Sequence, residues 1–256
     1  MSMFDLKGKV AVVTGGSRGI GRSICEQLAA QGAKVVVSSR KLPACEEVVQ
    51  AIKAKGGEAT AVAASISDKV QLESLVAAAR KAYGKIDILV CNAASNPYFG
   101  PLTGLKDDVF QKIMQNNVLS NLWLCNLVCP EMADRRDGVV IIVSSIGALV
   151  GSAHIAAYNM SKAADLSLVR SLAMEWGRHN IRINAIAPGL IRTDFARALW
   201  ENPEIRVAQE NRASLKRIGE PEDIGGVAAF LASKAGAFVC GQVIIADGGV
   251  MGSGAE

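Results

Sequence analysis

The sequence predicts an α/β fold: a single, doubly wound domain with a seven-stranded parallel sheet and helices on both faces. Short apolar runs alternate with longer segments of helical spacing along most of the 256 residues. Strands that are apolar on both faces, each followed by a helix, are typical of a parallel sheet covered on both sides. No linker, repeat or low-complexity stretch divides the sequence, so one domain is the expected count.

Seven short runs are predicted to be strands because they are rich in apolar and β-branched residues. They cover residues 9–14, 34–39, 59–64, 86–91, 138–144, 181–187 and 242–247. The segments between them place apolar residues at helical spacing, so we expect helices there. These segments cover residues 19–32, 43–56, 68–83, 106–135, 158–179 and 221–233.

The interval 188–220 follows the sixth predicted strand and departs from this alternation. It is rich in charge and contains Pro188 and Pro203, so we expect a loop with a helix or two. Sheets of this class bind ligands beyond the carboxyl ends of their strands. We therefore take the segment from about 190 to 215 as the one that shapes a substrate pocket.

Composition argues against several classes of protein. The formal net charge is +4 and no run of about five basic residues occurs, so we expect no nucleic-acid partner. The longest aliphatic stretch, 139–143, is far too short to span a bilayer, and Asp5 and Lys7 lie where a signal peptide would be apolar. The 6 cysteines form no CxxC pair and only 2 histidines accompany them, so we expect no metal and reduced, mostly buried thiols. A cytoplasmic protein without a membrane partner is the prediction.

A glycine-rich turn joins the first predicted strand to the first predicted helix. Its sequence, VVTGGSRGIG at 12–21, spaces three glycines as G-x3-G-x-G. Such glycines permit a tight turn and a close approach of backbone to phosphate, and the following helix N-terminus attracts a pyrophosphate. A turn without a ligand is the alternative, but the strand–turn–helix context favours dinucleotide binding. The residues expected to contact the dinucleotide here are Gly15, Ser17, Arg18, Gly19, Ile20 and Gly21.

The end of the second predicted strand indicates which dinucleotide. A carboxylate there would bind the ribose 2′-hydroxyl of NAD, but this strand ends at Ser39 and is followed by Arg40 and Lys41. A guanidinium without a competing carboxylate suits a 2′-phosphate. The sequence therefore favours NADP(H) over NAD(H); the alternative is that Arg40 and Lys41 are solvated charges at the start of a helix.

Further motifs in the same order make the chain resemble the short-chain dehydrogenase/reductase family, of the typical kind with about 250 residues and a Rossmann-type fold. The resemblance extends from Gly8 to the DGG at 247–249. TGGSRGIG resembles the family's TGxxxGIG. CNAAS at 91–95 resembles its NNAG, with Cys91 and Ala94 as departures, and implies that Asn92 and Ala93 lie beside the cofactor.

The resemblance also implies the remaining site residues. NNV at 116–118 places the family's asparagine on Asn117, VSS at 143–145 places its serine on Ser145, and YNMSK at 158–162 places its YxxxK on Tyr158 and Lys162. The segment APGLIRT at 187–193 resembles the family's PG motif. Where the family commonly has an aspartate near the adenine, this chain has a serine. The additional cofactor contacts implied by these matches are Ser65, Ile66, Pro188, Gly189, Ile191 and Thr193.

The spacing of Tyr158 and Lys162 fits proton transfer. Residues four apart share a helix face, and an ammonium about 5 Å from a phenol at an effective dielectric of ~20 is worth roughly 3 kcal/mol, or about two pKa units. The lysine is therefore expected to lower the tyrosine pKa, so that the phenol can protonate the alkoxide left by hydride transfer. Ser145 would hydrogen-bond the carbonyl oxygen. The family pattern implies that Asn117 holds a water that connects Lys162 to solvent.

The sequence thus predicts an oxidoreductase that transfers a hydride between NADP(H) and a small-molecule carbonyl or alcohol substrate. A ketone or aldehyde reductase and a 3-oxoacyl thioester reductase both remain open. Arg135 and Arg136 could dock an acidic carrier, but the nearby Asp134 and Asp137 weaken that case. A non-catalytic dinucleotide-binding sensor or scaffold is the alternative from another class. By resemblance, we expect a homotetramer.

Overall fold

The computed structural model describes residues 2–252. Its sheet has seven strands in the order β3-β2-β1-β4-β5-β6-β7, all paired in parallel. The strands are β1 (Val10–Thr14), β2 (Lys34–Ser39), β3 (Glu58–Ala63), β4 (Ile88–Cys91), β5 (Gly138–Val143), β6 (Ile181–Pro188) and β7 (Val243–Ala246). Each lies within two residues of its predicted bounds, and the predicted fold class is confirmed.

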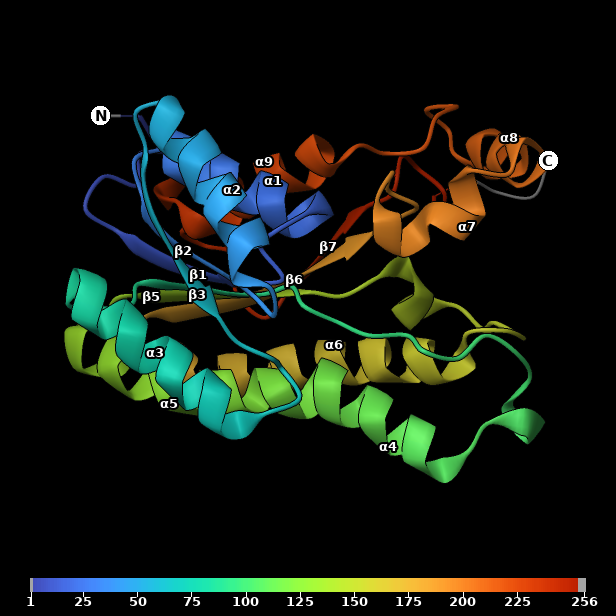
Figure 1. Ribbon diagram of the computed structural model, residues 1–256, viewed down its shortest axis with the longest axis horizontal. Helices are drawn as coiled ribbons and strands as arrows, with labels where there is room; N and C mark the ends of the chain where they lie inside the picture. The colour runs from blue at the N-terminus through green and yellow to red at the C-terminus, as the bar shows by residue number, and fades with distance from the viewer. Residues whose placement is uncertain (1, 253–256) are drawn as a thin grey trace.

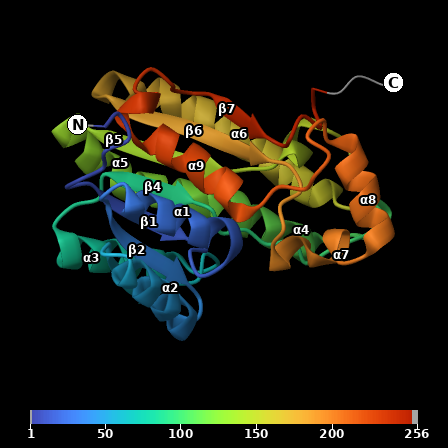
Figure 2. The same ribbon diagram turned by 90° about the horizontal axis from the view of Figure 1, so that it is seen from above.

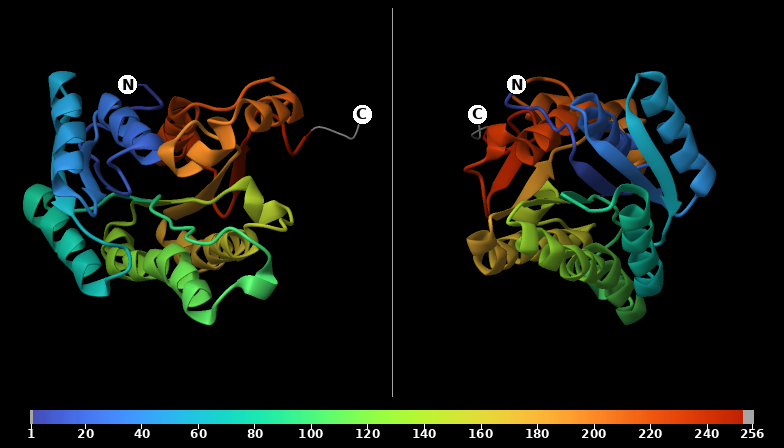
Figure 3. Two further views of the ribbon diagram at one scale, coloured as in Figure 1. Left: turned by 45° about the vertical axis from the view of Figure 1, so that its right-hand side comes forward. Right: turned by 90° about the vertical axis from the view of Figure 1, so that its left-hand side faces the viewer.

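Helices cover both faces of the sheet, which lies between two helical layers (Figures 1 and 3). One layer holds α1 (Gly19–Ala30), α2 (Leu42–Ala54) and α9 (Pro221–Ala232). The other holds α3 (Lys69–Tyr83), α4 (Asp107–Met114), α5 (Ser120–Arg135) and α6 (Ala156–Trp176). Each layer packs its own apolar cluster onto one face of the strands, so alternate residues of a strand enter different cores.

Burial explains why the central strands read as continuous apolar runs. Every residue of β1 and of β5 is buried, whereas β7 at the edge is only partly covered.

Local signals determine where a helix begins and ends. Asp68 accepts hydrogen bonds from two backbone N–H groups at the start of α3, and Gly84 ends that helix with a φ of 79°.

The predicted helix 106–135 is interrupted. Between α4 and α5 the chain forms a π-helical segment, Gln115–Leu119. Side chains of the next turn bond carbonyl oxygens of this segment: Ser120 Oγ donates to Asn116 at 2.7 Å, and Asn121 Nδ2 donates to Asn117 at 2.6 Å. Such π segments occur often at functional sites, where they turn a side chain toward a new direction.

The interval 188–220 contains two helices, α7 (Arg197–Trp200) and α8 (Pro203–Arg212), as its composition predicted. They lie together at the end of the molecule opposite the N-terminus (Figure 2). The Trp200 indole donates to the carbonyl oxygen of Thr193 at 2.8 Å, and its ring lies 5.6 Å from the Arg192 guanidinium. Trp200 therefore holds this segment together.

The cysteines are all free thiols, and five of them are buried, as expected. No helix within residues 2–252 has the length and apolar character needed to cross a membrane. In the same residues, no group of three or more potential metal ligands converges.

Candidate active site

A cleft of about 670 Å³ opens at the carboxyl ends of β1, β4 and β5. β1 pairs with β2 on one side and with β4 on the other, so the cleft lies at the point where the strand order reverses. This is the place where doubly wound sheets bind ligands. Predicted site residues that line it are Gly15, Ser17, Arg18, Gly19, Ile20, Gly21, Ser39, Arg40, Lys41, Ser65, Ile66, Asn92, Ala93, Tyr158, Lys162 and Thr193.

The glycines of the turn after β1 have no room for a side chain. Gly15 has a φ of +64° and Gly19 a φ of +51°, both in the left-handed region. A Cβ on Gly21 would lie 2.2 Å from the carbonyl oxygen of Gly15. The first turn of α1 carries no acid, and its N-cap residue, Arg18, makes no side-chain capping bond. The free N–H groups and positive end of this helix fit a pyrophosphate.

Cations line the cleft beyond β2. Arg40 and Lys41 are exposed, and within residues 2–252 neither forms an ion pair. Arg18, across the turn, has its guanidinium 3.6 Å from the Asp194 carboxylate, which partly neutralises its charge. Among the residues that line the cleft, Asp194 is the one carboxylate, and neither Arg40 nor Lys41 pairs with it.

Thr14, which was not predicted, organises the exit of β4. Its hydroxyl accepts from the backbone N–H groups of Asn92 at 3.1 Å and Ala93 at 3.2 Å. The Asn92 amide donates to the carbonyl oxygens of Thr14 at 2.9 Å and Gly15 at 3.2 Å. The CNAAS segment therefore steadies the glycine turn from the neighbouring strand.

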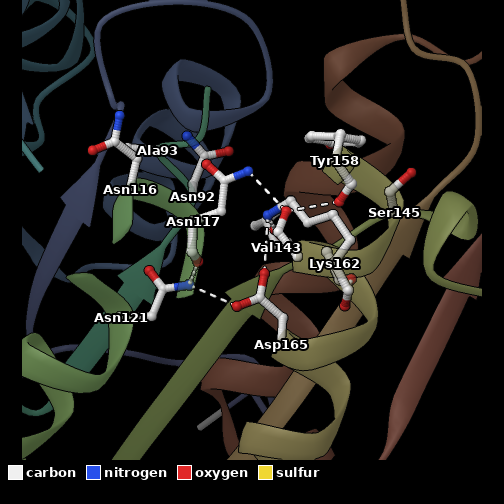
Figure 4. A network of polar contacts seen from close by, with 12 residues as sticks. Asn92, Ala93, Asn116, Asn117, Asn121, Val143, Ser145, Tyr158, Lys162 and Asp165 are labelled. Carbon is white, nitrogen blue, oxygen red and sulfur yellow. Dashed lines mark hydrogen bonds and ion pairs between the residues drawn. The ribbon is translucent and has the colours of Figure 1, made fainter. Parts of the chain in front are cut away.

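Tyr158 and Lys162 lie on successive turns of α6, and both line the cleft. The Lys162 amine is 5.9 Å from the centroid of the Tyr158 ring and donates to the carbonyl oxygen of Val143 at 2.9 Å. Figure 4 shows this amine between Asn117 and Tyr158. The lysine side chain is 2% exposed, so its charge acts in a medium of low polarity.

The Lys162 charge has a counter-ion that was not predicted. Asp165 Oδ2 lies 3.0 Å from the Lys162 amine, and the aspartate is 0% exposed. Burial alone would lower the pKa of Lys162, but Asp165 and Tyr158 outweigh it, and the net pKa is raised. Burial raises the pKa of Asp165 despite Lys162 and the Asn121 amide, which both lower it. The sequence signal for this pair was the spacing of three residues on one helix.

The pKa of Tyr158 corrects one expectation. Burial of the phenol is the largest influence and raises the pKa; Lys162 lowers it, Asp165 raises it, and the Ser145 hydroxyl lowers it as a hydrogen-bond partner. The net pKa lies above the ordinary value of 10.0. The expected lowering by Lys162 is present, but burial is the larger influence, so the net shift of the pKa is upward.

Asn117 lies in the π-helical segment and is fully buried. Its amide nitrogen donates to Ser161 Oγ at 2.9 Å and to the Ser95 carbonyl oxygen at 3.0 Å, and its amide oxygen accepts from the Ser95 N–H at 2.8 Å. The side chain thus joins the exit of β4 to α6. Ser145 follows β5 and accepts from the Gly147 N–H at 3.0 Å.

The PG segment is only partly at the cleft. Thr193 lines it together with Asp194 and Phe195, whose ring centroid is 6.0 Å from that of Tyr158. Ile191 is 4% exposed and packs into the core of the α1 layer, so its side chain points away from the cleft. The other predicted residues that do not line the cleft are Asn117, Ser145, Pro188 and Gly189.

Comparison with known proteins gives the family. A family model described as enoyl-(acyl carrier protein) reductase matches residues 15–251. Dehydrogenase/reductase SDR family member 4 from Bos taurus is 41% identical over 244 residues, which cover 95% of this chain and 88% of the relative. The chain belongs to the short-chain dehydrogenase/reductase family.

Solved structures of the family superpose on nearly the whole chain. A 7α-hydroxysteroid dehydrogenase, complexed with NADH and 7-oxo glycochenodeoxycholic acid, is 37% identical with a TM-score of 0.93 and covers 96% of this chain and 95% of its own. A gluconate 5-dehydrogenase from Burkholderia cenocepacia J2315, in complex with NADP and tartrate, is 28% identical with a TM-score of 0.93 and covers 98% of each chain. As a member of this family, the chain is an oxidoreductase of alcohol and carbonyl substrates that binds a nicotinamide dinucleotide.

Proposed function

We propose that the chain is an NADP(H)-dependent carbonyl reductase in which Tyr158 donates the proton. The observation that carries this proposal is the buried Lys162 amine, 5.9 Å from the Tyr158 ring, at the wall of the dinucleotide cleft. A phenol beside a fixed cation can protonate the alkoxide that forms when a carbonyl carbon accepts a hydride. Ser145, whose hydroxyl lowers the pKa of Tyr158, would stabilise charge on the same substrate oxygen.

The cofactor supplies the hydride when it is bound. The glycine turn and the N-terminus of α1 hold its pyrophosphate, and Arg40, with Lys41 and Arg18, takes the 2′-phosphate of NADP(H). Ser65 and Ile66, which line the cleft, would contact the adenine, and Thr193 would contact the nicotinamide. The absence of an acid after β2 supports NADP(H) over NAD(H), although family members are found with either.

Asn117 has a supporting role in this proposal. Its side chain is occupied by Ser95 and Ser161, so a water that links Lys162 to solvent would bond its backbone carbonyl oxygen. That oxygen already accepts from Asn121 and keeps a second lone pair.

We further propose that the whole chain works as one domain, as a cytoplasmic homotetramer. Length, the free cysteines and one continuous sheet support a single cytoplasmic unit. Exposed apolar side chains on α6 and in or next to β7, among them Met174, Phe238 and Ile245, support subunit contacts there.

The proposal is tested by following the loss of reduced-nicotinamide absorbance with a panel of ketones, aldehydes, 3-oxoacyl thioesters and enoyl thioesters. Each substrate is assayed with NADPH and with NADH. We expect turnover of carbonyl compounds and a higher kcat/KM with NADPH. Turnover of enoyl thioesters alone, or an equal or higher kcat/KM with NADH, would contradict it.

A further inference from the structure

Asp165 is the third charged or ionisable side chain of α6 beside the cleft, after Tyr158 and Lys162, and it is the most deeply buried of them. It is 0% exposed and lies below the Lys162 amine, on the side away from Tyr158 (Figure 4). Its two carboxylate oxygens have separate partners: Oδ2 is 3.0 Å from the Lys162 amine, and Oδ1 accepts from Asn121 Nδ2 at 3.0 Å. A buried carboxylate needs such partners, and here both are fixed.

The Asn121 amide connects this carboxylate to the π-helical segment. The same nitrogen donates to the backbone carbonyl oxygen of Asn117 at 2.6 Å. Lys162 is held from the other side by the Val143 carbonyl oxygen at the end of β5. The ammonium therefore has a position set by α5, α6 and the sheet, and little freedom to move.

Few other groups contribute charge to this cluster. Cys91 of β4 raises the pKa of Lys162 electrostatically. The charge of Asp165 raises the pKa of Cys125 in α5. Cys129 has the largest single influence and lowers the pKa of the Cys125 thiol, but Cys91, burial and Asp165 together raise it well above its ordinary value, so Cys125 stays neutral. Among the groups of residues 2–252 that act on the Tyr158 phenol, Lys162 and Asp165 are the charged ones.

We propose that Asp165 is a positioning residue for proton transfer: its carboxylate fixes the Lys162 ammonium under Tyr158 and offsets its charge, so that the phenol keeps its proton through neutral pH. The proposal rests on the role proposed above for Tyr158 and adds to it a reason why the phenol is protonated, as reduction requires. With the three groups in place, the cluster is neutral while the phenol is protonated. Loss of a proton leaves one negative charge in a buried site, which is unfavourable.

Removing the carboxylate reverses this balance. Without Asp165, the cluster carries one positive charge before it loses a proton and none afterward. The first proton then leaves more readily, whether the phenol or the ammonium gives it up. The basic limb of the reductase pH profile must therefore move to lower pH.

The test is the pH profile of kcat/KM for carbonyl reduction in Asp165→Asn, which removes the charge and keeps the shape. We expect the basic limb to move down by about one pH unit or more. Asp165→Glu, which keeps the charge, should restore much of the wild-type profile. Asp134→Asn makes the same charge change at an exposed position of α5 and should leave the profile unchanged. An Asp165→Asn profile with an unshifted basic limb would overturn the proposal.

A second measurement needs neither turnover nor an Asp165 variant. The tyrosinate absorbance of the wild type is titrated against that of Tyr158→Phe, and the difference isolates Tyr158 among the 3 tyrosines. We expect Tyr158 to titrate no lower than an ordinary tyrosine. A Tyr158 that titrates near neutral pH would show that Asp165 does not offset Lys162. If the titration is as expected but Tyr158→Phe reduces carbonyls at the wild-type rate, the proposed function fails instead.

Discussion

The amine of Lys162 donates a 2.9 Å hydrogen bond to the carbonyl oxygen of Val143, the last residue of β5. This contact ties the cation of α6 to the carboxyl edge of the sheet, where the dinucleotide cleft opens. The position of the charge is therefore set by contacts within the fold.

Replacing Lys162 with Met should abolish reduction and also destabilise the protein. The variant leaves the Asp165 carboxylate buried without its counter-ion, which costs about 3–5 kcal/mol. Urea unfolding near neutral pH measures the loss in the free energy of unfolding.

The matched control is the double variant Lys162→Met/Asp165→Leu. It removes both charges, so most of the stability should return while activity stays absent. A double variant no more stable than the single one would mean that the two side chains do not depend on each other.

Gly21→Ala should disrupt the glycine turn. The added Cβ would lie 2.2 Å from the Gly15 carbonyl oxygen and 2.5 Å from the Asn92 amide, so backbone must shift. We expect a loss of about 2 kcal/mol in stability and at least about a tenfold weaker NADPH affinity, measured by fluorescence titration.

Gly226→Ala in α9 is the control for this substitution. Nothing lies within 4 Å of its Cβ position, and the residue is exposed in a helix. It should stabilise the protein by up to about 1 kcal/mol and leave NADPH affinity unchanged. Equal effects of the two alanines would argue against a steric requirement at the turn.

Arg40→Asp should change cofactor preference. The carboxylate would repel a 2′-phosphate and accept from a ribose 2′-hydroxyl, so kcat/KM with NADPH should fall at least about 100-fold while that with NADH changes little or rises. Arg40→Ala should give an intermediate loss with NADPH. An unchanged ratio of the two kcat/KM values would refute the role of Arg40.

Asp223→Asn tests a surface interaction at the start of α9. Asp223 accepts from both ends of the Arg217 guanidinium, at 2.6 and 3.0 Å, and from the Glu220 N–H at 2.8 Å. Arg217 first, then Glu220, hold the pKa of Asp223 below its ordinary 3.8. Because the pair is half-exposed, the variant should lose only about 1 kcal/mol at neutral pH.

The pH dependence of that loss has a definite sign. A carboxylate with a lowered folded-state pKa stabilises the protein above its unfolded-state pKa, and the contribution disappears as the pH falls through the folded-state pKa. The stability difference between wild type and Asp223→Asn should therefore shrink as the pH is lowered below the ordinary carboxyl pKa of 3.8. A stability difference that is the same at neutral pH and at low pH would show that the charge of Asp223 contributes nothing.

Much of the fold could be predicted from the sequence because its signals are local. Strands buried on both faces must be apolar throughout, and the turn after β1 tolerates only glycine at Gly21. The arrangement of Tyr158 and Lys162 followed from the helical repeat alone.

Features that depend on tertiary contacts could not be predicted in the same way. The π-helical segment is stabilised by Ser120 and Asn121, which look like ordinary helix residues in the sequence. Asp165 and Lys162 have the spacing of a solvated surface pair, and only the packing of α5 and α6 buries them. The net direction of the Tyr158 pKa shift depends on burial, which outweighs the lowering by Lys162 that the sequence predicted.

The proton-donor role of Tyr158 is tested most directly by comparing NADPH-dependent carbonyl reduction in the wild type and in Tyr158→Phe, with NADPH affinity measured for both. Loss of the hydroxyl should leave the affinity within about twofold and lower kcat by about 100-fold or more. A Tyr158→Phe enzyme that binds NADPH and reduces the same carbonyl at the wild-type rate would contradict it.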